Sequence, residues 1–185
     1  MAFENKGALA TTIVVAASDS LNQAAANYIC DGVNDHVEIQ AALDALPATG
    51  GEVLLLDGTY NIEVSLAMDS YQTLRGCGPN TVLTTSTTIT GLITAVGGSG
   101  TEKVGIVVAD LRIDGASTAY SGIYWDYVDY SDIRNVRASL ALAALRARGR
   151  SNNGQVLAVV ETPLSRLRQS FVVNEDIEAD RAVAH

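Results

Sequence analysis

Residues 31–60, with the sequence DGVNDHVEIQAALDALPATGGEVLLLDGTY, decide how the rest of the chain is interpreted. The stretch predicts a loop, a short helix over residues 34–46, a Gly-Gly break, a buried strand and a tight turn. Ile39, Leu43 and Leu46 are spaced i, i+4 and i+7, which places them on one face of the helix. The strand VLLL is apolar on both faces, as is typical of a parallel strand that is covered on each side.

After residue 60 the chain becomes a series of short strands rich in Val, Ile, Leu and Thr, separated by Gly and Asn. No helix of ten residues fits between these strands, so βαβ crossovers cannot connect them. Short strands joined by small turns are typical of a solenoid whose coils stack in parallel. The repeat is indicated by Ile106 and Ile123, 17 residues apart, and by Ile113 and Ile133, 20 apart. The predicted strands lie at 12–17, 53–56, 62–66, 72–74, 81–84, 91–96, 104–108, 111–113, 122–124 and 132–136.

The composition indicates one core of ordinary size and an uneven distribution of charge. Of 185 residues, 48% are hydrophobic and 5% aromatic, so we expect one principal domain with a core of Val, Ile, Leu and Ala. The formal net charge of −9 argues against nucleic acid as a partner. Residues 1–133 hold 4 basic and 16 acidic side chains, whereas residues 134–168 hold 7 Arg and one Glu. This contrast predicts a docking surface, within an oligomer or for another partner.

The pattern changes near residue 138, where we place a domain boundary. Residues 1–138 are expected to form the helix and the solenoid, and residues 139–185 an Arg-rich extension with an acidic tail. SLALAALRAR (139–148) has helical propensity, although its leucine spacing leaves an irregular strand open. Residues 155–160 are predicted to form a strand. We interpret the extension as an interaction or oligomerisation segment.

Neither the cysteines nor the N-terminus indicates a redox or secretory function. Cys30 and Cys77 lack a CxxC spacing and neighbouring His residues, so we expect buried free thiols, with a disulfide as the alternative, and no metal site. The start of the chain has no secretory signal, and no run reaches the ~18 apolar residues of a membrane span. We expect a soluble chain without a membrane partner, which reaches any virion or extracellular location by another route or inside a larger assembly.

The string CDGVNDHVEIQAALDALPATGGEVLLLDGTYNI (30–62) resembles the entry segment of right-handed parallel β-helix proteins of the pectate-lyase-like superfamily. LRGCGPNTVL, VADLRIDGA and IRNVRAS resemble later coils of that family. The resemblance implies an all-β fold, a short right-handed parallel β-helix (solenoid) with an N-terminal capping helix and a C-terminal extension. Only four or five coils fit before residue 138, fewer than family enzymes use. The family includes polysaccharide lyases, hydrolases and epimerases as well as phage tailspikes and surface proteins, so the resemblance implies no single activity.

Acidic side chains gather in the last two coils and are the candidates for chemistry. Paired carboxylates can cleave glycosidic bonds, and carboxylates that bind Ca²⁺ can support β-elimination with an Arg base. Alternation along one strand would place Asp126 and Asp132 on the same side and Asp129 opposite. Turn-forming and solvent-facing roles explain the same residues more simply, so we expect no cofactor, with Ca²⁺ as the alternative. The catalytic candidates are Asp110, Asp126, Asp129, Asp132 and Arg134.

Aromatic residues and arginines are the candidates for binding. Aromatic faces pack on the C–H groups of sugar rings, but they also form the centres of protein interfaces or cover an open coil end. The aromatic candidates are Tyr120, Tyr124, Trp125, Tyr127 and Tyr130. The interface candidates, which would otherwise form a solvated face, are Arg137, Arg146, Arg148, Arg150, Arg166 and Arg168.

Together these patterns favour a non-catalytic structural or interaction module of a virion (tail, spike or capsid-decorating) or of a cell-surface assembly. An open sheet edge invites further pairing, so the end opposite the helix must be closed by residues 139–173 or by neighbouring subunits. We expect a homo-oligomer, a trimer by analogy with phage β-helix spikes, and polysaccharide as a candidate ligand. The alternative is a polysaccharide lyase or glycoside hydrolase, or its N-terminal portion. Carboxylates converging in a groove on residues 104–136 would favour the enzyme, and carboxylates pointing apart would favour the module.

Overall fold

The computed structural model describes residues 12–116, 119 and 121–139, and the backbone of three later strands at 143–150, 156–157 and 171–172. This part consists mainly of short strands, with one α-helix, α1 (His36–Asp44), and one 3₁₀ turn, η1 (Gln23–Ala25). No helix in the described residues is long and apolar enough to cross a membrane.

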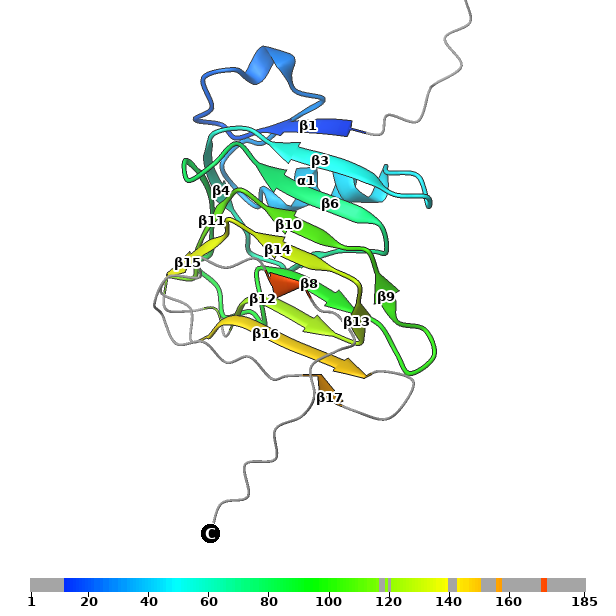
Figure 1. The fold of residues 1–185 in the computed structure, drawn as a ribbon. Coiled ribbons are helices and arrows are strands. Elements are labelled where there is room, and N and C mark those ends of the chain that lie inside the picture. Colours follow the sequence, from blue (N-terminus) through cyan, green and yellow to red (C-terminus); the bar gives the residue numbers. More distant parts are fainter. Residues whose placement is uncertain are drawn as a thin grey trace, which may run out of the picture.

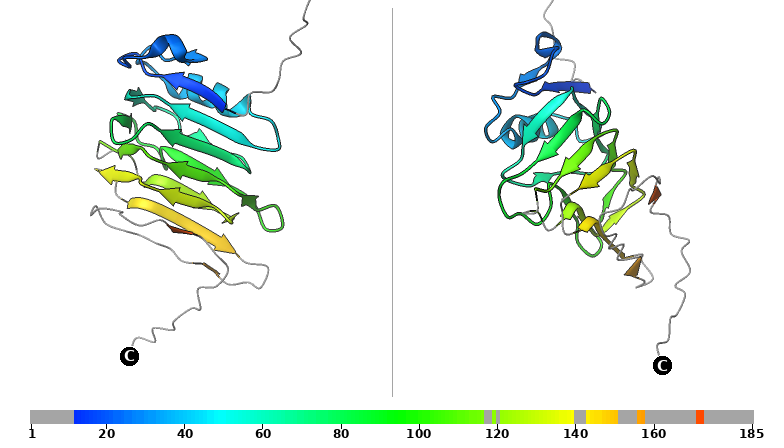
Figure 2. Two further views of the ribbon diagram at one scale, coloured as in Figure 1. Left: turned by 45° about the horizontal axis from the view of Figure 1, so that its top comes forward. Right: turned by 90° about the vertical axis from the view of Figure 1, so that its left-hand side faces the viewer.

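The strands form three parallel sheets, which we call A, B and C. The chain passes through A, B and C in turn and then returns to A one strand further along, and we call each passage a coil. Figures 1 and 2 show the coils stacked from the N-terminal end to the C-terminal end. The prediction of an all-β fold with parallel sheets is therefore confirmed.

The strands of each sheet follow the order of the chain. Sheet A contains β1 (Thr12–Ala16), β3 (Gly51–Leu55), β6 (Gln72–Gly76), β10 (Val107–Ala109) and β14 (Asp132–Arg134), with β2 (Tyr28–Ile29) paired to β1. Sheet B contains β4 (Gly58–Asn61), β7 (Thr81–Thr84), β11 (Arg112–Asp114) and β15 (Arg137–Ser139). Sheet C contains β5 (Leu66–Ala67), β8 (Ile93–Val96), β12 (Ser121–Asp126) and β16 (Ala143–Arg150). A fourth, two-stranded parallel pair joins β9 (Lys103–Val104) and β13 (Val128–Asp129).

Columns of buried aliphatic side chains run through the stack and form the core. In sheet A, strand register aligns Ile13, Val53, Leu74, Val108 and Ile133, all of them buried. Each such side chain contributes about 1.5–3 kcal/mol when it is removed from water. Side chains at equivalent positions of successive coils contact one another, which explains how a chain with few aromatic residues builds a continuous core.

Helix α1 and the loop before it close the N-terminal end, as the sequence predicts. Ile39, Ala42 and Leu43 of α1 are buried. The side chain of Gln40 pairs with β5, the first strand of sheet C, because its Oε1 accepts from the N–H of Ala67 (2.9 Å) and its Nε2 donates to the carbonyl of Ala67 (3.1 Å). Gln40 thus supplies the hydrogen bonds that a preceding strand would make.

Two aspartates close the first strand of sheet B in the same way. Asp19 Oδ1 accepts from the N–H of Thr59 at 2.9 Å, and Asp35 Oδ2 accepts from the N–H of Asn61 at 2.8 Å, both on β4. β2 and β1, the first strands of sheet A, themselves belong to the cap. The cap therefore closes all three sheets at the N-terminal end of the stack.

The opposite end is covered in part by the C-terminal extension. Strand β16 continues sheet C beside β12, so residues 143–150 form a strand and not the helix that propensity favours. Tertiary pairing overrides a weak local preference. Two short strands then pair antiparallel, β17 (Val156–Leu157) with β16 and β18 (Phe171–Val172) with β14. The division into residues 1–138 and 139–185 stays a prediction.

Three further expectations are wrong in detail. The structure aligns Val108 with Ile133, 25 residues further along the chain. It aligns Ile113 with Ala138 and Ile93 with Ile123, so both proposed repeat pairs, Ile106 with Ile123 and Ile113 with Ile133, are wrong. Coil length varies, reaching 34 residues between Leu74 and Val108, because loops of unequal length join the strands. The strand expected at 62–66 is replaced by β4 and β5. Finally, both cysteines are free, but Cys77 is exposed and only Cys30 is buried.

Candidate functional site

The outward side of sheet A brings together two of the predicted catalytic residues, Asp132 and Arg134. They lie on β14 and form an ion pair, with Arg134 Nε 3.0 Å from Asp132 Oδ2. A second pair lies higher on the same sheet, where Arg75 donates from Nε and Nη2 to both oxygens of Glu52 at 2.9 Å. This carboxylate also raises the pKa of Arg75 above its usual value. Each acid of this sheet face is therefore bound to its own guanidinium.

Asp110 occupies the bend between sheets A and B and has a structural contact. Its Oδ1 accepts a hydrogen bond from Asn135 Nδ2 at 2.9 Å, one coil further on. Both residues have positive φ, 54° and 52°, a conformation that Asn and Asp tolerate better than most side chains. The pair therefore stabilises equivalent turns of adjacent coils.

Asp126 and Asp129 lie apart from this face. Asp126 ends β12 of sheet C, and Asp129 lies on β13. The expectation that Asp126 and Asp132 share one side of a single strand is wrong, since the chain bends at Tyr127 and Tyr130, where φ is 55° and 47°. The acids considered as Ca²⁺ ligands belong to separate strands, and no three of them among the described residues bring ligand atoms within 4.8 Å of one another.

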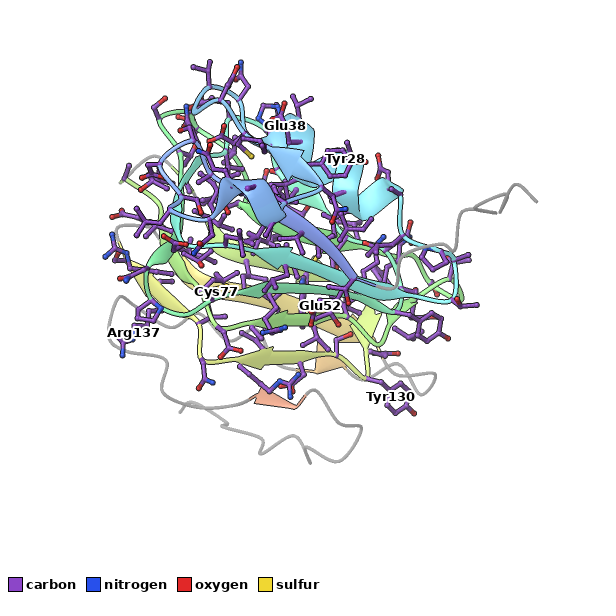
Figure 3. The ribbon with its side chains drawn as sticks, turned by 90° about the horizontal axis from the view of Figure 1, so that it is seen from above. Tyr28, Glu38, Glu52, Cys77, Tyr130 and Arg137 are labelled. Carbon is purple, nitrogen blue, oxygen red and sulfur yellow. The ribbon has the colours of Figure 1, made fainter. Side chains whose placement is uncertain are left out.

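The aromatic candidates are also distributed over different surroundings. Trp125 is 1% exposed and belongs to the core, so its ring cannot contact a ligand at the surface. Tyr124 and Tyr127 are half-buried, whereas Tyr130 is 58% exposed. Figure 3, a view from above the stack, places Tyr130 at one edge of the molecule. Tyr120 lies outside the described residues.

Of the predicted interface arginines, Arg137 is exposed on β15. In Figure 3 it lies with Cys77 on the side opposite Tyr130. Positions 146 and 148 of β16 are in register with Tyr124 and Asp126. The side chains of Arg146, Arg148 and Arg150, and the whole of Arg166 and Arg168, lie outside the described residues.

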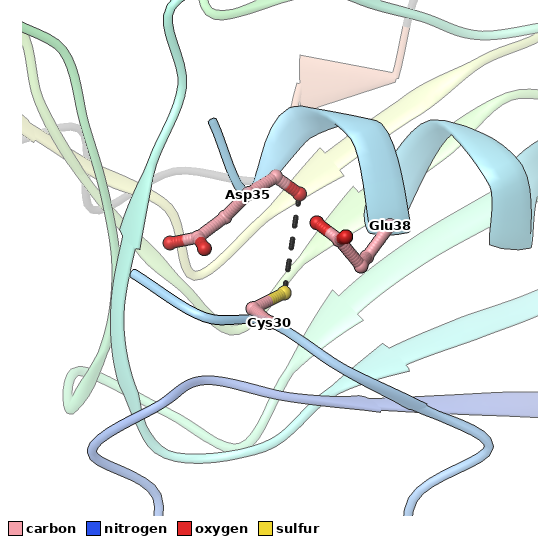
Figure 4. Close-up of side chains that lie close together, drawn as sticks. All are labelled: Cys30, Asp35 and Glu38. Carbon is pink, nitrogen blue, oxygen red and sulfur yellow. Dashed lines mark hydrogen bonds between the residues drawn. The ribbon is translucent and has the colours of Figure 1, made fainter. Parts of the chain in front are cut away.

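A group of ligand-type side chains that the sequence analysis did not single out lies in the cap. Cys30, Asp35 and Glu38 present atoms within 4.8 Å of one another (Figure 4). Asp35, however, is fully buried and accepts from the backbone N–H of Gly32 through Oδ1 and of Asn61 through Oδ2, each at 2.8 Å. Burial raises the pKa of the Cys30 thiol to about 12, which keeps it protonated. These contacts fit a structural link between loop, helix and β4 better than a metal site.

Sequence reasoning missed Glu52, Arg75 and Tyr71. Glu52 and Arg75 are 23 residues apart and meet only through the register of β3 and β6. Tyr71 is 54% exposed and comes from a different coil than the aromatic cluster in the sequence. Because the coil length is irregular, no fixed spacing in the sequence links these residues.

No protein-family model and no curated protein matches this chain. Among solved structures, ORF18 of Geobacillus virus E2 is similar with a TM-score of 0.54 and 20% identity, covering 60% of this chain and 24% of the viral chain. The A-module of the mannuronan C-5 epimerase AlgE6 from Azotobacter vinelandii gives a TM-score of 0.46 and 28% identity, covering 64% and 35%. The viral protein shares the fold, and this chain spans about a quarter of its length.

Proposed function

We propose that this chain is a right-handed parallel β-helix module with a structural and docking role in a virion or a cell-surface assembly. The passage of the chain through three parallel sheets supports a β-helix, and parallel crossovers are right-handed in about 98% of cases. The fold shared with a viral protein supports the virion as its location. A pectate-lyase-like ancestry, suggested by the cap and first coil, belongs to the same proposal.

The placement of the carboxylates is the observation that carries the non-catalytic role. Glycoside hydrolysis needs two carboxyl groups that face one bond across an open site, about 5–10 Å apart. In this chain Asp110 is bound to Asn135 and Asp132 to Arg134, while Asp126 lies on another sheet. Arg134, the candidate base for β-elimination, is held in the ion pair with Asp132. These side chains therefore serve the coils more directly than they would serve a reaction.

The proposed module is a homo-oligomer, with three copies as the expected stoichiometry. Its Arg-rich segment 134–168 supplies the positive charge that the acidic coils lack. Among the described interface candidates, the exposed Arg137 is available for a contact between copies. No cofactor takes part in this role.

An assay on the full chain tests the proposal against the polysaccharide-acting alternative. Acidic and neutral polysaccharides would be incubated with the protein, and both unsaturated uronate ends and reducing ends would be measured. We expect no release above the blank. Asp132→Asn serves as the matched variant, because Asp132 is a predicted catalytic residue whose Oδ1 has no hydrogen-bond partner among the described residues. Release of ends by the wild type and its loss in Asp132→Asn would overturn the proposal.

A further inference from the structure

One corner of the stack, where the chain enters sheet A, carries glycine and tyrosine in alternate coils. The registers of β3, β6, β10 and β14 align Gly50, Tyr71, Gly105 and Tyr130. All four have positive φ, of 97°, 65°, 67° and 47°. This conformation is unfavourable for a bulky side chain, so the surrounding coils must hold both tyrosines in it. We call Tyr71, Gly105 and Tyr130 the tyrosine corner.

Hydrogen bonds between coils fix the backbone of the tyrosine corner at Tyr71 and Gly105. The carbonyl of Tyr71 accepts from the N–H of Gly51 in the coil above (3.3 Å), and its N–H donates to Val104 in the coil below (2.8 Å). The N–H of Gly105 donates to the carbonyl of Asp129 in the next coil at 3.3 Å. The corner is thus preorganised, and a ligand would not have to order it.

Gly105 makes room for the ring of Tyr71. A Cβ atom at position 105 would lie 2.9 Å from Cδ1 of that ring. The Tyr71 ring therefore packs against the backbone of Gly105, in the coil that lies between those of Tyr71 and Tyr130. Tyr71 and Tyr130 are 54% and 58% exposed, and two strand spacings separate their backbones by roughly 10 Å along the stack.

The surroundings of the tyrosine corner are polar and acidic. A shallow hollow borders it next to the end of α1, lined by Asp44, Leu46, Pro47, Ala48, Asp69, Ser70 and Gln72. Lys103, the basic residue at this corner, is bound to Asp69. Asp44 and Glu102 add negative charge, so an anionic polymer would be repelled. A stable protein interface buries an apolar centre of several hundred Å². Two tyrosine rings among polar neighbours do not provide such a centre.

We propose that the tyrosine corner binds a neutral polysaccharide, with Tyr71 and Tyr130 each stacking on a sugar ring. The C–H face of a sugar packs on the exposed aromatic face, while the carboxylates of Asp44 and Asp69 and the hydroxyl of Ser70 in the hollow hydrogen-bond to its hydroxyl groups. The inference rests on the proposed non-catalytic function, because the glycan is held and not cleaved. An acidic polysaccharide is disfavoured by the charge of the corner, and a second protein by its small apolar area.

Affinity electrophoresis of the full chain tests this proposal. The gels would contain laminarin, dextran or mannan as neutral probes, and alginate or polygalacturonate as acidic probes. We expect at least one neutral probe to retard the protein and the acidic probes to leave its mobility unchanged. The variant Tyr71→Gly/Tyr130→Gly should weaken retardation about tenfold or more. Glycine adopts positive φ without strain, so this variant removes the rings and retains the backbone.

Two further variants test whether binding depends on the tyrosine rings or on other exposed side chains. Gly105→Ala should weaken binding because its methyl group displaces the Tyr71 ring and strains the backbone at φ 67°. Leu21→Ala, which removes an exposed apolar side chain in the cap, should bind as wild type. Retardation by acidic probes alone, by no probe, or equally in the double glycine variant at unchanged Tm would overturn the proposal. Loss of oligomers in the double variant with no glycan binding in the wild type would assign the corner to a protein interface. Release of polysaccharide ends, measured separately, would instead count against the non-catalytic function.

Discussion

Asp35 illustrates how a residue of catalytic type serves the fold. Both of its carboxylate oxygens accept backbone hydrogen bonds, one from the loop at Gly32 and one from β4 at Asn61. The side chain is completely buried, so these bonds have no competition from water. Asp110 and Asp132 likewise hold a turn and a strand through Asn135 and Arg134.

Replacing Asp35 with Ala should destabilise the protein by about 3 kcal/mol, because two backbone N–H groups lose a charged acceptor. Urea unfolding would measure the change in the free energy of unfolding. Asp31→Ala is the control, since Asp31 is exposed and, in the described part of the chain, accepts only from the N–H of Val33. This substitution should cost less than about 1 kcal/mol. Equal effects of the two substitutions would contradict the structural role of Asp35.

The two thiols should differ in reactivity. Burial raises the pKa of Cys30 to about 12 and hinders access to it, whereas Cys77 is exposed with a pKa raised more modestly by partial burial. At pH 8, iodoacetamide should modify Cys77 in the native protein and Cys30 only after unfolding, as mass spectrometry of peptides would show. Since the pKa of Cys30 is higher in the folded state than its usual 9.0, its contribution to stability is complete below pH 9 and decreases as the pH rises towards 12. Rapid native modification of Cys30 would contradict its position.

At the scale of elements, helix α1 closes the end of a sheet through a side chain. Gln40 pairs with both backbone groups of Ala67 on β5 and so replaces a strand. This arrangement leaves the first strand of sheet C without an open edge at Ala67, which is a common means of preventing further strand addition.

Gln40→Leu should therefore expose the edge of β5. We expect the amide hydrogen of Ala67 to exchange at least tenfold faster, with a loss of stability of about 1 kcal/mol. Gln23→Leu, which removes cap hydrogen bonds to Ala17 and Ser18, should leave the exchange of Ala67 unchanged. Unchanged protection of Ala67 in Gln40→Leu would show that the Gln40 contacts do not close the edge.

The cap and first coil were predictable from the sequence, whereas the later register was not. Helical spacing and the Gly-Gly break locate α1 and β3 because these signals are local. The alignment of Val108 with Ile133, or of Tyr71 with Tyr130, depends on loops of unequal length that carry no regular spacing. Trp125 resembled a surface aromatic because its neighbours are tyrosines, yet alternation along β12 turns it inward. Asp132, Arg134 and Tyr130 were therefore identified by residue type. Glu52, Arg75 and Tyr71 were not, and the grouping of all six residues required the structure.

At the scale of the whole molecule, charge changes along the chain. Lys and Arg are absent between residues 12 and 74, whereas seven arginines lie between residues 134 and 168. Segments of opposite charge favour contacts between copies that weaken as salt screens them. The proposed assembly would use this charge distribution in the contacts between its copies.

The mass of the full chain in solution tests the central claim most directly. Size-exclusion chromatography with light scattering would be run at low and high salt. The proposed assembly module predicts an oligomer, about three times the 19.4 kDa of one chain, that is less populated at high salt. A monomer of 19.4 kDa at every salt and protein concentration, together with release of polysaccharide ends, would contradict the account.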